Sequence, residues 1–231
     1  MRLSLVSSLW MSLVFGAFLT LDMHWTLLSQ EPVSQQPAPQ IKSGNLELET
    51  SRVYVRVGKV GLGHEHGASC KLKASTLHLS QPDASGSFGK LVFDMTSFEA
   101  DSDASRKYVG LEGSTDEATR KQVNENLLGK DVLDVEKYAT ATFEAKRVTK
   151  LDELSKRGLP KYKFEGDFTL HGTTKPLEFA ADVEVVKGWN HLRGGFAILQ
   201  SAYGIKPYSK MLGAVGVTDR LLIYGDLIVA P

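Results

Sequence analysis

The sequence predicts an all-β protein whose strands pair in antiparallel sheets. The main observation is that apolar and polar side chains alternate with a period of two, as in strands with one buried and one solvated face. A second observation is that a single long connection departs from this pattern and shows helical spacing instead. About eight segments alternate, and they span residues 52–57, 70–80, 90–96, 140–146, 161–170, 177–185, 192–198 and 221–229.

Residues 161–170, KYKFEGDFTL, show the alternation most clearly, with aromatic residues on one side and charged residues on the other. Eight such strands can form a sandwich of two sheets or close into a barrel, and closure removes the exposed edges. Several inward positions are small, which either leaves volume for a ligand or lets the wall bend sharply. These small residues are Ala141, Ala145, Gly166, Ala181, Gly194 and Gly225.

The helical interruption joins the third and fourth strands, from about residue 101 to residue 138. Residues 114–117, STDE, form a capping box that predicts Ser114 as the N-cap of a helix. Gly129 is expected to end this helix, and a second short turn is expected over residues 131–138. A connection of this length is usually functional, so we expect it either to plug one end of the sheet or to act as a lid. Apolar residues at roughly helical spacing support the helix: Ala118, Val123, Leu127 and Leu128.

Composition excludes several classes of protein. The 231 residues include 27 basic and 27 acidic side chains, so the formal net charge is zero. The sequence thus lacks the excess of basic residues that is typical of proteins that bind nucleic acid. Cys70 is the single cysteine, so an internal disulfide is excluded. The sequence also lacks a phosphate-binding glycine loop, a G-x-S-x-G elbow and an H-E-x-x-H helix. We therefore predict no enzymatic activity.

The first 41 residues differ from the rest because they hold only three charged side chains, Arg2, Asp22 and Glu31. An uncharged apolar run follows Arg2, so residues 1–29 are predicted to be a signal peptide or an N-terminal membrane anchor. Residues 30–44 are rich in Gln and Pro and are predicted to be a linker. The folded domain is expected over residues 45–231, in the periplasm or secreted, with membrane association through the leader as an alternative.

Three groups of segments carry a family resemblance, and they occur in the family's order. They are FEGDFTLHGTTKPL at 164–177, LGKDVLDVEKY at 128–138 with ATF at 141–143, and GFAI at 195–198 with YGI at 203–205 and VTD at 217–219. Over about residues 48–230 the chain thus resembles the YceI-like family, the lipid- or polyisoprenoid-binding domain of bacterial envelopes. The resemblance implies an extended eight-stranded antiparallel lipocalin-like barrel, with a short helical excursion between strands 3 and 4.

The resemblance also implies that the bore holds an elongated apolar ligand: a polyisoprenoid, an isoprenoid quinone or a fatty-acid-like lipid. Burial of such a chain gains about 25 cal/mol for each Å² of apolar surface removed from water. The expected function is that of an exported, non-enzymatic carrier. Its expected partner is this lipid, and no other bound group or cofactor is expected. The alternative is that the inward side chains simply fill a closed core. Ten residues are predicted to contact the ligand: Val53, Val55, Phe93, Met95, Phe143, Phe164, Phe168, Phe179, Phe196 and Ile223.

The segment GLGHEHG at residues 61–67 supports an alternative function, that of a metal-binding protein or a metal-dependent enzyme. On a strand, His64 and His66 would project to the same face, which suits a shared metal ion. Zinc needs three or four ligands, so His171 or His191 would have to complete the set. The flanking glycines equally suit a tight turn in which both histidines have no metal.

Overall fold

The computed structural model describes residues 42–80 and 84–231. The predicted leader (1–29) and most of the predicted linker (30–41) lie outside the described residues. The chain divides into two units, residues 1–39 and 40–231, and all the described residues belong to the second unit. Gly44, at the end of the predicted linker, already donates a backbone hydrogen bond to the carbonyl of Ala230 (3.0 Å). No helix in the described part of the chain is long and apolar enough to span a bilayer.

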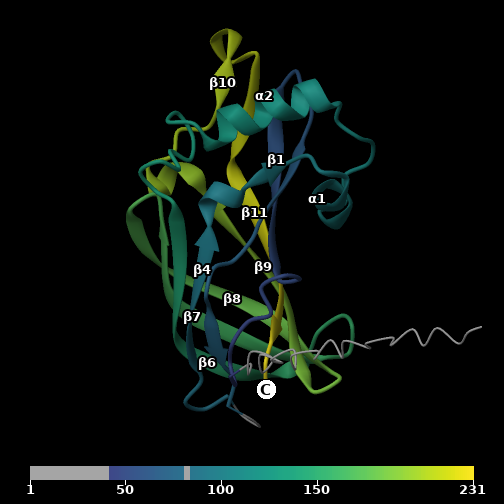
Figure 1. Ribbon diagram of the computed structural model, residues 1–231, viewed down its shortest axis with the longest axis vertical. Helices are drawn as coiled ribbons and strands as arrows, with labels where there is room; N and C mark the ends of the chain where they lie inside the picture. The colour runs from purple at the N-terminus through teal and green to yellow at the C-terminus, as the bar shows by residue number, and fades with distance from the viewer. Residues whose placement is uncertain (1–41, 81–83) are drawn as a thin grey trace, which may run out of the picture. The chain divides into compact units, whose positions relative to one another are not determined.

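The fold is all-β, as the sequence predicts, and eleven strands within the described residues make one antiparallel sheet (Figure 1). Seven of the eight predicted strands are present, only residues 76–78 of the one predicted over 70–80 form a further strand (β3), and β2, β5 and β10 are short additional ones. The strands are β1 (Arg52–Gly61), β2 (His66–Cys70), β3 (Thr76–His78), β4 (Phe88–Asp94), β5 (Glu99–Ala100), β6 (Thr140–Leu154), β7 (Pro160–Leu170), β8 (Thr173–Val186), β9 (Trp189–Leu199), β10 (Ser209–Lys210) and β11 (Val215–Val229).

The sheet closes into a barrel. Its strand order is β3-β4-β6-β7-β8-β9-β11-β1-β2-β5, with β10 paired to β11. The residues that come after β2 return to β4 through a bridge between Leu72 and Phe93 and a hydrogen bond from the Lys73 amide to the Val92 carbonyl (2.8 Å). These contacts join β4, next to one end of the strand order, to the residues that follow β2, next to the other end, which decides between the barrel and the sandwich that the alternation left open.

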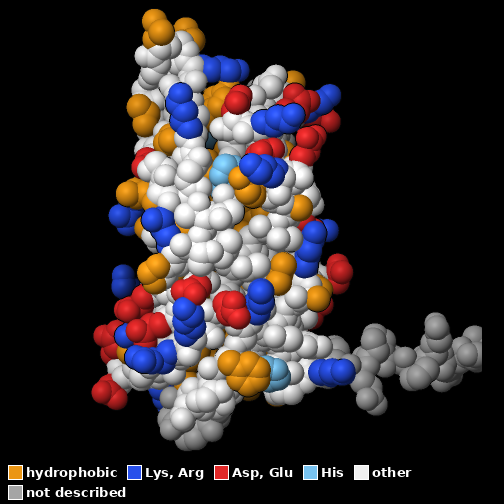
Figure 2. All heavy atoms as spheres, turned by 90° about the vertical axis from the view of Figure 1, so that its left-hand side faces the viewer, with side chains coloured by type: hydrophobic (Ala, Val, Ile, Leu, Met, Phe, Trp, Pro, Cys, Tyr) orange, Lys and Arg blue, Asp and Glu red, His pale blue; other side chains and the backbone are white. Residues whose placement is uncertain are grey.

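The period-two pattern separates the inside of the barrel from its outside. On β7, every second residue from Tyr162 to Leu170 is buried, Gly166 included, whereas the residues that alternate with them are partly exposed. The outer face carries ion pairs, and Figure 2 shows positive and negative side chains interspersed over one side of the molecule. The zero net charge therefore describes the exterior, because the buried core cluster is apolar apart from a few polar groups.

Gly166 shows why some inward positions are small. A Cβ at Gly166 would stand 2.1 Å from the Glu144 carbonyl oxygen, beside an irregularity in the β6–β7 register. Gly194 is confined in the same way, since its Cβ would stand 2.6 Å from a carbonyl of β8. Gly225 differs, because the nearest atom would lie 3.8 Å away. Close backbone approach thus explains two of these glycines, and free volume explains the third.

The helical interruption contains two helices, α1 (Asp103–Tyr108) and α2 (Glu117–Leu128). Helix α2 ends at Gly129 as predicted, but the prediction of Ser114 as its N-cap is wrong. The Asp116 carboxylate caps it by accepting a hydrogen bond from the Thr119 amide (3.0 Å). Helix α1 was not predicted, and residues 131–138 form turns. Figure 1 shows α2 across the end of the barrel near β10.

Three 3₁₀ turns complete the described elements: η1 (Met95–Ser97), η2 (Gln200–Tyr203) and η3 (Met211–Gly213). Helix α2 buries none of its residues fully, but Val123 and Leu127 pack against the barrel core. The predicted plug at one end of the sheet is therefore present: one side of α2 packs against the interior of the barrel.

Candidate functional site

The barrel encloses a cavity of ≈ 180 Å³ toward the α2 end. Strands from around the barrel contribute to its wall, and so do α2 and the turns that come after it. Four polar side chains interrupt an otherwise apolar lining: His66, Asn126, Gln200 and Tyr208. The Gln200 amide already donates a hydrogen bond to the Thr218 carbonyl (2.7 Å). Such a wall suits a ligand that is apolar over most of its length.

The ten residues predicted to contact a ligand all lie on the wall of this cavity or of a smaller one. Three of them, Phe143, Phe164 and Phe179, line only the smaller cavity, whose volume is ≈ 50 Å³. Seven line the larger cavity: Val53, Val55, Phe93, Met95, Phe168, Phe196 and Ile223. Val53, Phe93, Phe196 and Ile223 border both. Contact with a ligand remains a prediction for each of the ten.

Two aromatic rings, Phe93 and Phe196, border both cavities together with Val53 and Ile223, and further rings pack against them. Phe168 meets Phe93 edge to face with centroids 6.1 Å apart, and it meets Phe196 in the same way at 5.9 Å. Phe179 lies 5.2 Å from Phe196 and stacks on Phe164 at 5.3 Å. Such ring pairs favour defined relative orientations. The rings between the two cavities therefore hold one another in position.

Sequence reasoning missed the part of the wall that comes from the helical interruption. Val123 and Leu127 of α2 line the larger cavity, as do Val132 and Leu133 from the next turns. The helical spacing of Val123 and Leu127 was a usable signal, because apolar residues four apart share one face of a helix. The direction of that face depends on the connection as a whole, which the spacing does not specify.

Cys70 also lines the larger cavity, and its side chain is almost fully buried. Burial raises the pKa of the thiol to about 12, because a thiolate would lose its hydration there. The thiol is therefore protonated at neutral pH, and it behaves as a small apolar wall group rather than a nucleophile.

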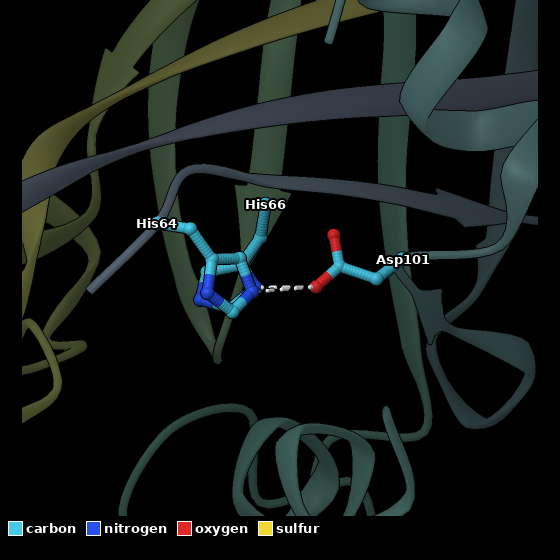
Figure 3. A group of neighbouring side chains, drawn as sticks. All are labelled: His64, His66 and Asp101. Carbon is cyan, nitrogen blue, oxygen red and sulfur yellow. Dashed lines mark hydrogen bonds and ion pairs between the residues drawn. The ribbon is translucent and has the colours of Figure 1, made fainter. Parts of the chain in front are cut away.

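At the start of β2, beside this cavity, His64 and His66 face the same aspartate, Asp101 (Figure 3). His66 Nδ1 lies 2.6 Å from Asp101 Oδ2, and His64 Nε2 lies 3.5 Å from the same oxygen. The two imidazole centroids are 4.5 Å apart. Both histidines thus face one carboxylate, although His64 precedes β2 and does not lie on the strand from which this arrangement was expected.

Asp101 is fully buried, and its other oxygen is also engaged. Oδ1 accepts hydrogen bonds from the Gly67 amide and from Arg106 Nη1, both at 3.1 Å. Burial by itself would raise the pKa of this carboxyl, but the hydrogen bonds and charge of its partners, His66 foremost, lower it to about 2. Asp101 is therefore a carboxylate at neutral pH, with Oδ2 directed at the two histidines.

The expectation that His171 or His191 completes this group is wrong. His191 pairs instead with Asp226 on β11, and His171 packs its ring against Tyr138 at 4.1 Å. The third member, Asp101, lies 35 residues after His66 and reaches it because β5 pairs with β2. No local spacing in the sequence indicates this contact.

Comparison with known proteins identifies the family of this chain. A family model of the YceI-like domain matches residues 45–226. The chain belongs to the YceI-like family. Among curated proteins, a UPF0312 protein of Vibrio cholerae is 28% identical over 134 residues, which are 57% of this chain and 67% of that protein. A UPF0312 protein of Ectopseudomonas mendocina is 32% identical over 110 residues, covering 47% of this chain and 52% of that one.

Among solved structures, the crystal structure of Burkholderia cenocepacia BcnA is similar to this YceI-like barrel. It has a TM-score of 0.54 and 17% sequence identity, and the match covers 80% of this chain and 99% of that one. At this identity the likeness concerns the fold alone. The family model confirms the family resemblance found in the sequence, and the structure confirms the antiparallel barrel that it implied.

Proposed function

We propose that this protein is a non-enzymatic carrier that holds an elongated apolar ligand inside its barrel. The ligand class is a polyisoprenoid, an isoprenoid quinone or a fatty-acid-like lipid. The observation that supports this most is the larger cavity, whose wall is apolar except at four side chains. The protonated thiol of Cys70 adds to it, since it leaves that wall without a nucleophile at this position.

The size of the cavity limits what it holds in the present conformation. A protein cavity of about 150 Å³ lined by aliphatic and aromatic groups binds benzene. A volume of ≈ 180 Å³ thus suits a segment of a chain rather than a whole polyisoprenoid. The smaller cavity lies beyond Phe93 and Phe196, which border both spaces. Movement of these rings would let a longer chain extend along the bore.

The same proposal covers location and partners. The apolar run after Arg2 supports export to the periplasm or the outside of the cell, with the leader cleaved or kept as an anchor. Membrane association through that segment would keep the carrier close to a source of lipid. Nucleic acid is not among the proposed partners, because the charge is balanced.

The test is to purify the full-length protein, extract it with organic solvent and identify any lipid by mass spectrometry. The delipidated protein is then offered a polyisoprenol, a ubiquinone and a fatty acid, and bound lipid is measured after gel filtration. We expect uptake of about one lipid per chain, as for a single-ligand barrel. A protein that is purified empty and takes up none of the three would contradict the proposal.

Two variants with the same substitution make this test specific. Ala141 is buried and lines the larger cavity, so Ala141→Phe fills part of it. Ala197 lies on β9 between the cavity-lining Phe196 and Ile198, and therefore faces outward. Lipid uptake should fall in Ala141→Phe and persist in Ala197→Phe, with circular dichroism confirming that both are folded. Equal uptake by the two variants would place the lipid outside the cavity.

A further inference from the structure

We propose that His64, His66 and Asp101 form a binding site for a divalent transition-metal ion, with zinc as the best match. The site shares His66 with the wall of the larger cavity, but the inference does not rest on lipid binding. Each residue offers one ligand atom, and the three atoms lie within 4.8 Å of one another. Two imidazoles and one carboxylate are the ligand set of zinc sites that keep a fourth position for water or another molecule.

The distances require only a small adjustment. Zinc bonds of about 2.0–2.2 Å place neighbouring ligand atoms of a tetrahedral site about 3.4 Å apart. The 3.5 Å between His64 Nε2 and Asp101 Oδ2 already meets this value. The 2.6 Å between His66 Nδ1 and the same oxygen is that of a hydrogen bond. An ion that replaces the shared proton would move these two atoms apart by less than about 1 Å.

Outer contacts hold the carboxylate in the orientation that a metal ligand needs. The Gly67 amide and Arg106 occupy Oδ1, which leaves Oδ2 for the imidazoles. The backbone of Asp101 has a φ of +59°, a conformation that residues other than glycine adopt uncommonly. Arg106 is itself fixed, because its remaining nitrogens donate to the carbonyls of Glu112 and Gly113. Partners that orient a ligand in this way are typical of metal sites.

Arg106 also sets a limit on affinity. Its positive charge neutralises part of the Asp101 carboxylate and opposes a second cation nearby. Glu65 adds no compensating charge, since it pairs with Arg56 at 2.8 Å. We therefore expect weaker binding than at a site with an unpaired carboxylate.

A simple structural hydrogen bond explains His66 but leaves His64 without a role. The His66–Asp101 contact alone ties β2 to the end of β5. The His64 side chain is 45% exposed and still directs Nε2 toward the same carboxylate. Within the described residues, its ring also lies against the ring of His66. A metal ion accounts for both imidazoles.

The experiment is a zinc titration of the full-length protein after removal of metal with a chelator. Binding is followed by competition with a chromophoric zinc indicator, and Co²⁺ is added separately to read the coordination from its visible absorption. The test variant is His64→Gln, because His64 is exposed and its replacement leaves the His66–Asp101 bond in place. The matched control is His191→Gln, since His191 also pairs with an aspartate but has no second histidine beside it.

We expect one zinc ion per chain in the wild type and in His191→Gln. In His64→Gln the affinity should fall by more than about tenfold, the lower limit for loss of even an outer-shell partner. Zinc should raise the thermal midpoint of the wild type more than that of His64→Gln, while the metal-free proteins should unfold together. Absence of zinc uptake by the wild type, or equal affinity in wild type and His64→Gln, would overturn the proposal.

Discussion

The ring of Phe168 stands edge-on to the ring of Phe196, with their centroids 5.9 Å apart. Phe196 borders both cavities, whereas Phe168 borders only the larger one. Four residues border both cavities, Val53, Phe93, Phe196 and Ile223, and we infer that their side chains divide the barrel interior. This division makes the usable length of the bore depend on a few aromatic residues, which can be replaced one at a time.

Replacement of Phe196 by alanine should join the two cavities. The variant should lose about 3 kcal/mol of unfolding free energy when empty, the low end for Phe→Ala in a core, because Phe196 is partly buried and its removal leaves a void. It should also bind longer chains better relative to short ones than the wild type does. Urea unfolding measures the first effect, and competition among fatty acids of increasing length measures the second.

Phe88→Ala is the control for that experiment. Phe88 is 59% exposed and packs on His78 rather than lining either cavity. Its replacement should leave the chain-length preference unchanged. If both variants shift this preference equally, the aromatic boundary does not select ligand length.

Gly166→Ala should destabilise the barrel, while Gly225→Ala should not. The new Cβ at Gly166 would meet the Glu144 carbonyl oxygen at 2.1 Å, and a backbone atom in a paired strand has little freedom to move. We expect a loss of about 1–3 kcal/mol, as for overpacked cores. At Gly225 the nearest atom is 3.8 Å away, so a methyl group fits. Urea unfolding of both variants measures the difference, and equal stabilities would refute the close approach.

The sequence predicted the wall of the barrel well because the signal for a wall residue is local. Phe164 and Phe168 are inward since every second residue of a strand faces the same side. The choice between Ser114 and Asp116 as N-cap was harder, because both residue types cap helices well. The contact of His66 with Asp101 was beyond local patterns. It depends on the pairing of β2 with β5 and on the left-handed backbone of Asp101.

Replacement of Asp116 by alanine should loosen α2, whereas replacement of Ser114 should have no such effect. The Asp116 carboxylate accepts a hydrogen bond from the Thr119 amide. Without that carboxylate, the amide loses its hydrogen-bond partner within the chain. Backbone amides in the first turn of α2 should then exchange with solvent faster. Hydrogen exchange monitored by mass spectrometry compares the two variants. Faster exchange in Ser114→Ala alone would restore Ser114 as the cap.

The thiol of Cys70 should resist modification in the folded protein. Its side chain is 3% exposed, and burial raises its pKa to about 12. Since the thiolate is the reactive form, a rise above the usual value means that less thiolate is present at every pH below about 12. At pH 8 a disulfide reagent should label the native protein very slowly and the urea-unfolded protein rapidly. Addition of an apolar ligand should slow the native reaction further, because Cys70 lines the larger cavity. Rapid labelling of the native protein at pH 8 would show that the cavity opens to solvent at this wall.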